Sequence, residues 1–588
     1  LQREALRAVL HETPIQPPIT DTLRLLGSDG FTRLDRTESL SNVSHSDEQD
    51  IRALYPRMTE QQVRVLAENL RASPSGPHVE IQRLQNDYLQ LQNDLHIWAN
   101  DPPARHPDTG AALTALQKRA EIQNRRLLRE EILKGWRREY PTAINQYGMA
   151  TGHALRLVHP IIGDLPTLSA DLSHITALAL DGTATPGSLE GFLQHFPQLQ
   201  MLDARNLKLP ALPQVLTSLS SLRELRMRKC GLSLTTTTQS VLASMPQLTI
   251  LDLQGNALGL PPDLHTMPSL RYVNLSNTGI HSLPDDLLNH PRLISGQFDG
   301  NRMTAVPEPF FGLPPSLSDG FTFADNPLTP AARERVKRFH GSTGRHFGIR
   351  PERADLQRTI RLFPALDEEQ ATAMLYRLPG TLAEGRAQLT LWETEVKQLN
   401  LELSQWINQA ATSHPETGER LPHAERTREL NARRAFAQQL ERFWRSRDQF
   451  TRSGEFEATA EFSGDMPVLS ANFEHVLRLK LTGNANISAS LPFVDSFPNL
   501  VSLSLNGFDL TTGSLPGRNL LQLTDLKLKN CGLVMTPEYQ AELVSLNTLQ
   551  TLNLSGNPLG TFPDLNLFPA LTFLDLSYSD LSVAPQGL

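Results

Sequence analysis

Residues 222–280 contain three similar stretches: LRELRMRKCGL at 222–232, LTILDLQGNAL at 248–258 and LRYVNLSNTGI at 270–280. Each follows the pattern LxxLxLxxNxL, with Cys or Thr standing in for Asn. Apolar residues alternate through the LxL segment, which is typical of a β-strand, and the polar residue marks the turn that ends it. Repeats of this kind predict a solenoid whose strands form one curved parallel sheet.

The same pattern recurs in both halves of the chain. It begins at Ile175, Leu199, Leu222, Leu248, Leu270 and Leu293, near Ser318, and again at Val476, Leu500, Leu523, Leu549 and Leu571. Each of the five later positions lies 301 residues after an earlier one (476 − 175 = 301). Such agreement predicts two copies of one array.

A helical unit precedes each array. Apolar residues at alternating spacings of three and four form one stripe per copy: Ile81, Leu84, Tyr88, Leu91, Leu95 and Trp98, then Leu389, Trp392, Val396, Leu399, Leu403 and Trp406. The copies lie 308 residues apart (406 − 98 = 308), and HPDTG at 106–110 returns as HPETG at 414–418. Thr59 with Gln62, and Asp367 with Gln370, predict helix caps. A stripe of this kind could grip a partner helix, but packing within a helical hairpin is favoured.

These patterns predict the α/β class: a solenoid of two tandem modules, each an α-helical cap followed by a curved parallel-sheet array. The expected division is 1–50, the tail of a preceding domain and a linker; 51–160, the first cap; 161–345, the first array; 346–455, the second cap; and 456–588, the second array, truncated. We expect the chain to be a fragment, since it opens without Met and stops inside a repeat.

Composition excludes several function classes. The formal charge is −8 with no basic block, so nucleic acid is not expected as a partner. No run of 18 apolar residues is present, so no membrane span is expected. The two cysteines, Cys230 and Cys531, cannot form a disulfide framework, and both stand at the turn position, where a structural role is favoured over a nucleophilic one. No catalytic, metal or cofactor motif is found, so no catalytic residue, cofactor or metal is predicted.

Binding residues are expected on the concave face of each sheet, at the positions between the inward leucines. Each array offers cations beside one aromatic residue, and both types are frequent interface anchors. The alternative is that they are ordinary solvated sheet residues. The candidates are Glu224, Arg226, Arg228, Asp252, Tyr272 and Asn274 in the first array, and Arg478, Lys480, Lys527, Lys529, Phe573 and Asp575 in the second.

The repeat pattern resembles the leucine-rich repeat family. More narrowly, the duplicated segments LYPRMTEQQ (54–62) and RLFPALDEEQ (361–370), with repeats and few cysteines, resemble large bacterial effector or toxin proteins. These join a dermonecrotic-toxin-like N-terminal region to repeats and a NEL-type E3 ubiquitin ligase domain. In leucine-rich repeats, the resemblance implies, the side chain at the Asn or Cys position hydrogen-bonds the backbone of the turn.

The resemblance further implies that the repeats select a substrate protein and that a Cys-x-Asp motif carries catalysis. Cys230 and Cys531 are each followed by Gly-Leu, so any ligase activity would belong to residues outside this chain. It also implies secretion by a bacterium, action in the host cytoplasm and a host protein as the partner. Contact with neighbouring domains of the parent, as a structural spacer or autoinhibitory module, is the alternative.

Overall fold

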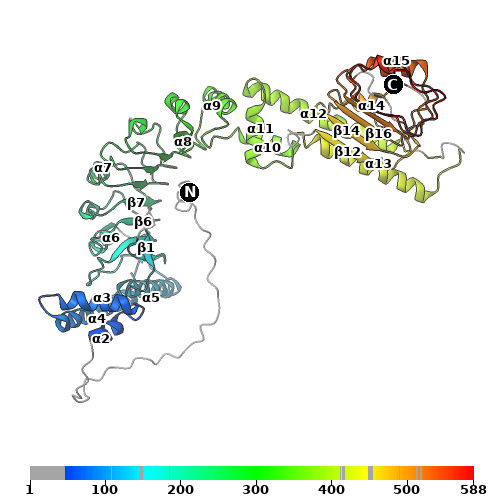
Figure 1. Ribbon diagram of the computed structural model, residues 1–588. Helices are drawn as coiled ribbons and strands as arrows, with labels where there is room; N and C mark the ends of the chain where they lie inside the picture. The colour runs from blue at the N-terminus through cyan, green and yellow to red at the C-terminus, as the bar shows by residue number, and fades with distance from the viewer. Residues whose placement is uncertain are drawn as a thin grey trace. The chain divides into compact units, whose positions relative to one another are not determined.

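A computed structural model gives the fold (Figure 1). It describes residues 47–587 except 108, 145–149, 185, 286, 411, 414–417, 448–453, 489–490, 512–513 and 517–519. The predicted tail and linker at 1–50 and the HPETG loop therefore lie almost entirely outside the described residues. The chain forms two compact units, one running through Ala332 with Phe347–Ile349, the other comprising Arg333–His346 and the chain from Arg350 onward.

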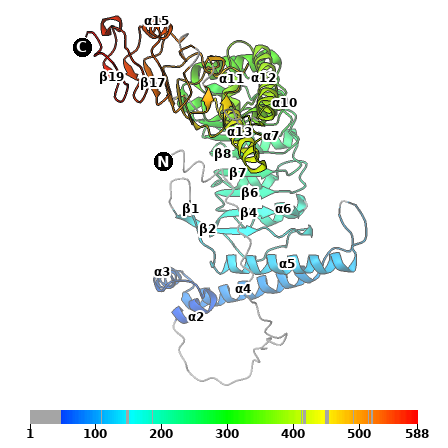
Figure 2. The ribbon, with the colours of Figure 1, turned by 90° about the vertical axis from the view of Figure 1, so that its right-hand side faces the viewer.

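Four helices open the first unit: α2 (Asp47–Leu54), α3 (Glu60–Arg71), α4 (Pro77–Asn100) and α5 (Ala115–Trp136). The predicted cap of α3 is confirmed, because Thr59 and Gln62 exchange hydrogen bonds between side chain and backbone in both directions. The apolar stripe of α4 faces α5, and Figure 2 shows the two long helices side by side. Tyr88 packs with its ring centroid 4.9 Å from that of Trp136, so the stripe serves intramolecular packing, as favoured.

A parallel sheet follows, with strand order β1-β2-β4-β6-β7-β8-β9-β10-β11 in the described part. The strands are β1 (Thr142–Ile144), β2 (Ala150–Leu157), β4 (Ile175–Asp181), β6 (Met201–Arg205), β7 (Glu224–Arg228), β8 (Ile250–Asp252), β9 (Tyr272–Asn274), β10 (Ser295–Gln297) and β11 (Phe321–Thr322). The strands from β4 onward stand where the repeats predict them. The first two fall in a stretch that was expected to be helical, and β1 pairs antiparallel with β2.

Buried asparagines hold successive turns together. Asn256 accepts hydrogen bonds from the N–H groups of Cys230 (2.9 Å) and Leu232 (3.1 Å) and donates to two carbonyl oxygens, those of Met227 and Leu253. Its counterpart in the second sheet, Asn557, makes the equivalent four bonds. One side chain therefore satisfies four backbone groups that the tight turns leave without strand partners. This is the role that the family resemblance implied for the Asn position.

The second unit repeats this order of elements. Its helices are α9 (Pro330–Thr343, in this unit from Arg333), α10 (Arg353–Leu362), α11 (Glu368–Arg377), α12 (Leu382–Asn408) and α13 (His423–Trp444). Its parallel sheet has the order β12-β14-β16-β17-β18-β19. These strands are β12 (Glu455–Thr459), β14 (Arg478–Thr482), β16 (Ser502–Asn506), β17 (Asp525–Lys529), β18 (Thr551–Asn553) and β19 (Phe573–Asp575). The predicted cap at Asp367 and Gln370 is confirmed.

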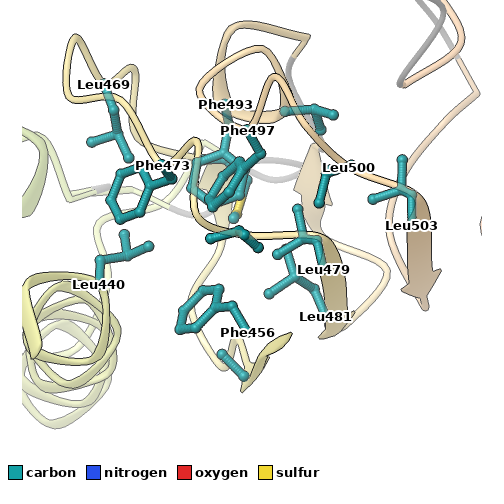
Figure 3. Packing of buried hydrophobic residues seen from close by; sticks show 14 of the residues in the cluster. Leu440, Phe456, Leu469, Phe473, Leu479, Leu481, Phe493, Phe497, Leu500 and Leu503 are labelled. Atoms are coloured by element: carbon teal, nitrogen blue, oxygen red, sulfur yellow. The ribbon is translucent and has the colours of Figure 1, made fainter. Parts of the chain in front are cut away.

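One hydrophobic core joins the helices of the second unit to its sheet. Leu440 of α13 lies against Phe456 of β12 and Phe473, and the leucines of the next strands continue the cluster (Figure 3). Because each strand contributes its inward residues to the same core, the repeats bury apolar surface that no single repeat could bury alone.

Short elements cover the other side of each sheet or flank it. They are α6 (Pro186–Leu193), α7 (Thr236–Ala243), α8 (Pro315–Ser318), α14 (Leu491–Val494), α15 (Pro537–Ser545), the 3-10 turns Gln214–Ser218, Leu287–Asn289, Glu308–Gly312 and Leu565–Leu567, and the strand pairs β3 (Ile162–Gly163) with β5 (Thr183–Ala184) and β13 (Gly464–Asp465) with β15 (Ile487–Ser488).

A buried ion pair fastens each helical hairpin to its sheet. In the first unit Arg125 Nε lies 2.6 Å from Glu121, and its guanidinium also donates to the carbonyls of Trp98 and Ile162. Glu121 in turn accepts from the N–H of Ile162. No local sequence pattern predicted this arrangement.

The second unit holds the same arrangement 308 residues later. Arg433 pairs with Glu429 at 3.0 Å and donates to the carbonyls of Trp406 and Ser463. Both arginines also lie over a tryptophan ring, at 4.8 Å from the centroid in the first unit and 4.9 Å in the second. The charges of these two arginine–glutamate pairs are thus paired and hydrogen-bonded, which offsets the cost of desolvation.

Candidate binding faces of the two sheets

The first sheet places five of the six predicted binding residues in two adjacent rows across its strands. Asp203, Arg226, Asp252 and Asn274 stand in register on β6 to β9. Glu224 and Tyr272 stand in register in the neighbouring row, separated by Ile250. The sixth, Arg228, stands in a third row and reaches the others through ion pairs with Asp203 and Asp252. All six first-array candidates are therefore brought together, and Asp203, which was not among them, joins the group.

Opposite charges in this group pair with one another. Arg228 lies between two carboxylates, with Asp203 at 3.4 Å and Asp252 at 3.1 Å. Arg226 forms an ion pair with Glu224 at 2.9 Å. We call these five residues the first-face network. Its charges are compensated within the protein.

The network is also largely removed from solvent. Asp252 and Tyr272 are each 4% exposed, and Arg226 is 8% exposed. Burial raises the pKa of Asp252, and the nearby guanidinium of Arg228 opposes this rise. Burial likewise raises the pKa of Glu224, with Arg226 opposing, and raises that of the Tyr272 hydroxyl. Little charge or polar surface on this face is left for a ligand, so the part of these residues in binding stays a prediction.

The second sheet places its candidates in the same two kinds of row. Lys480, Ser504, Lys527, Asn553 and Asp575 are in register across β14 to β19. The adjacent row runs from Arg478 through three polar residues to Phe573. A third row pairs Asn506 with Lys529.

Most acids of the second face already have partners. Lys480 forms an ion pair with Glu457 at the edge of the sheet. Asp575 accepts hydrogen bonds from Ser577 (2.6 Å) and Asn553 (2.8 Å), and the bonds from Ser577 above all hold the pKa of Asp575 below its usual value.

Three cations of the second face lack such partners. Within the part of the chain that the structure describes, no side-chain hydrogen bond or ion pair is formed by Arg478, Lys527 or Lys529. The two lysines are half-buried and Arg478 is exposed. Phe573, in the adjacent row, is 53% exposed. This face therefore keeps both charge and apolar surface available to a partner.

The two cysteines have a structural position. Both are buried, and each thiol lies close to backbone carbonyls, with Cys230 Sγ 3.3 Å from the oxygen of Arg228 and Cys531 Sγ 3.1 Å from that of Lys529. Burial raises the pKa of Cys230 to about 12 and that of Cys531 to about 11. Since the thiolate is the reactive form, neither group is suited to nucleophilic chemistry at neutral pH.

Neither a metal cluster nor a membrane-crossing helix occurs among the described residues. Among them, no three His, Cys, Asp or Glu side chains cluster in a way that could hold a metal ion. No described helix is both long enough and apolar enough to cross a membrane.

Comparison with known protein families identifies the repeat. The family model described as Leucine Rich Repeat matches residues 548–568, the segment that contains β18 and the buried Asn557. Residues 548–568 are a leucine-rich repeat. Other repeats of the chain share its strand and turn, and several place a buried asparagine at the position of Asn557, among them Asn256, Asn301 and Asn326, so the fold is a leucine-rich repeat solenoid. None of the curated proteins compared with this chain matches it.

Three solved structures illustrate what the chain is similar to at low identity. An internalin (InlF) of Listeria monocytogenes is 12% identical, with 84% of this chain and 90% of that chain covered and a TM-score of 0.24. A leucine-rich repeat protein of Leptospira interrogans is 16% identical, with 70% and 81% covered and a TM-score of 0.24. A chain of the Toll–Spätzle complex of Drosophila is 16% identical, with 72% of this chain and 42% of that chain covered and a TM-score of 0.25.

Proposed function

We propose that this chain is a protein-interaction scaffold built from two tandem copies of one module, each a helical cap and a leucine-rich repeat array. The observation that carries the proposal is the second concave face, where Lys527 and Lys529 lack internal partners and Phe573 is half exposed. Cationic and aromatic side chains on a rigid sheet are suited to binding another protein, because little conformational entropy is lost on binding.

We further propose that this scaffold is the target-recognition region of a bacterial secreted effector that acts in the host cytoplasm on a host protein. The support is the resemblance carried by LYPRMTEQQ and RLFPALDEEQ, together with the repeats. The parent would then be an E3 ubiquitin transferase whose Cys-x-Asp motif lies outside these residues. The buried Cys230 and Cys531, with raised pKa values, are consistent with a chain that recognises its target without catalysing transfer itself.

The proposal is tested with a bulky, uncharged substitution that obstructs the second face. Ser504 is half-buried at the centre of that face, and Ser504→Trp would fill the space above it. Ser545→Trp, at an exposed position on α15, is the matched control. We expect the full chain, immobilised, to capture specific proteins from host-cell lysate, and the Ser504→Trp variant to lose them while Ser545→Trp keeps them. If both variants, folded by circular dichroism, capture the same proteins as the parent, the second face is not a binding surface.

The first-face network favours a second function for part of the molecule. Because Arg226 and Arg228 are paired internally, the first array is suited to be a structural spacer or an autoinhibitory module of a larger protein. This function predicts that deleting residues 47–332 leaves target capture unchanged but alters the activity of the parent protein. Loss of capture upon this deletion, with residues 333–588 still folded, would contradict it.

A further inference from the structure

The two concave faces differ at the positions that decide whether a cation is paired. Under the 301-residue offset, the two acids that hold Arg228 in the first face are replaced by neutral residues in the second. Aligned by this offset, Asp203 corresponds to Ser504, Asp252 to Asn553, Arg226 to Lys527, Arg228 to Lys529 and Tyr272 to Phe573.

The consequence for Lys529 follows from its neighbours. Its counterpart Arg228 has a carboxylate on each side, but Lys529 faces Asn506 in register on the preceding strand. Asn553, at the position of Asp252, is neutral, and its amide donates to Asp575. The cation is therefore present in both faces, and its internal counter-charges are present only in the first.

The remaining described acids of the second face form no ion pair with Lys527 or Lys529, because each has another partner. Glu457 pairs with Lys480, and Asp525 accepts a hydrogen bond from Thr524 at 2.8 Å. Asp575 is held by Ser577 and Asn553, although Lys529 also contributes to its lowered pKa. Lys527 and Lys529 thus form the one place on this face, within the described residues, where two neighbouring cations have no direct ion-pair partner.

The position of Phe573 adds a second contact. It stands two strands from Asp525, which lies two residues before Lys527 on the same strand. Neighbouring strands are about 4.8 Å apart and residues rise about 3.3 Å along a strand, so Phe573 lies about 12 Å from Lys527 and about 16 Å from Lys529. An extended chain covers the shorter distance in about four residues.

We propose that the second face binds an extended protein segment that carries adjacent acidic residues opposite Lys527 and Lys529 and an apolar residue about four positions away, over Phe573. This rests on the proposed scaffold function and names the chemistry of its partner. A continuous polyanion such as nucleic acid fits less well, because Glu457, Asp525 and Asp575 flank the lysines and would repel it. An isolated acidic pair avoids that repulsion.

The experiment uses the full chain and a fluorescein-labelled 12-residue peptide of Ser and Gly that contains Asp-Glu and, about four residues after Glu, Leu. A peptide with Asn-Gln in place of Asp-Glu and a 12-nucleotide single-stranded DNA are the comparison probes. We expect fluorescence polarisation to show binding of the acidic peptide that weakens with salt, at least about tenfold weaker in Lys527→Glu/Lys529→Glu and several-fold weaker in Phe573→Ala.

The matched control is Arg119→Glu/Lys397→Glu, which makes the same change of net charge at two exposed helix positions. It should bind the acidic peptide as the parent does. Equal binding of the Asn-Gln peptide, tighter binding of the DNA, or no binding of the acidic peptide would overturn the proposal. If that happens while Ser504→Trp still abolishes protein capture, only the partner chemistry is wrong; if Ser504→Trp has no effect on capture either, the scaffold function itself fails.

Discussion

The two concave faces share a backbone plan but use their cations differently. In the first face Arg228 lies within 3.4 Å of two carboxylates, and Asp252 is 4% exposed. In the second face Lys529 stands at the equivalent position without an ion pair in the described chain. The guanidinium of Arg228 is therefore occupied by internal ion pairs, whereas the ammonium of Lys529 is available to a binding partner. A basic residue on a repeat sheet is thus not by itself a sign of binding, since its neighbours decide its role.

The ion pairs of Arg125 with Glu121 and of Arg433 with Glu429 provide the opposite case, because here the two units agree. We call each of these ion pairs a clamp. We expect Arg125→Met to destabilise the first unit by about 3–5 kcal/mol and Arg433→Met to destabilise the second by a similar amount, because each leaves a buried glutamate without its partner. Denaturant titration followed by tryptophan fluorescence would measure this, as each unit holds its own tryptophans.

The exposed pair of Arg83 with Glu80 supplies the control for that measurement. Arg83→Met removes a surface ion pair and should change stability by about 0–1 kcal/mol. If Arg125→Met were as mild as Arg83→Met, the clamp would not be the contact that fastens the first hairpin to its sheet.

A half-buried histidine in each unit gives a second effect of intermediate size. Desolvation, together with nearby Arg138 for His174 and Arg447 for His475, lowers the pKa of each histidine to about 4. His153 also acts on His174 in that direction, whereas Asp171 opposes it. The unfolded chain takes up these protons near pH 6.5, and the folded chain only near pH 4.

Stability is therefore complete above about pH 6.5 and is lost as the pH falls toward 4, by about 2 kcal/mol per histidine at pH 5. We expect His475→Phe to make the stability of the second unit depend less on pH and to leave the pH dependence of the first unit unchanged. Unfolding followed at about pH 7 and pH 5 checks the expectation. An unchanged slope in the variant would show that His475 is not the titrating group.

The smallest expected effect tests the comparison of the faces directly. Arg228→Ala should destabilise the first unit by about 1 kcal/mol, because Asp252 stays buried without its cation. Lys529→Ala should change the stability of the second unit by less than about 0.5 kcal/mol. Thermal unfolding of both variants measures the difference. Equal losses would mean that Lys529 has an internal partner in solution, and the distinction between the faces would fall.

Local patterns predicted much of the fold. In the two parallel sheets, β4 to β11 and β14 to β19 follow the predicted repeats, the stripes of α4 and α12 are largely buried, and both predicted capping boxes form. Each depends on residues within a few positions of one another. The strands β1, β2 and β12 were missed. β2 has a short alternation of buried Leu155 and Leu157, and β12 one of buried Phe456 and Ala458, but neither carries the full repeat pattern.

The sequence alone determined the repeats, their spacing and the equivalence of Cys230 with Cys531, since side-chain periodicity follows directly from helix and strand geometry. Only the tertiary structure decided which outward charges are free. Whether Arg228 or Lys529 has a partner depends on residues 25 or so positions away that the solenoid places on adjacent strands. Ion pairing depends on that distance in space, which no local pattern contains.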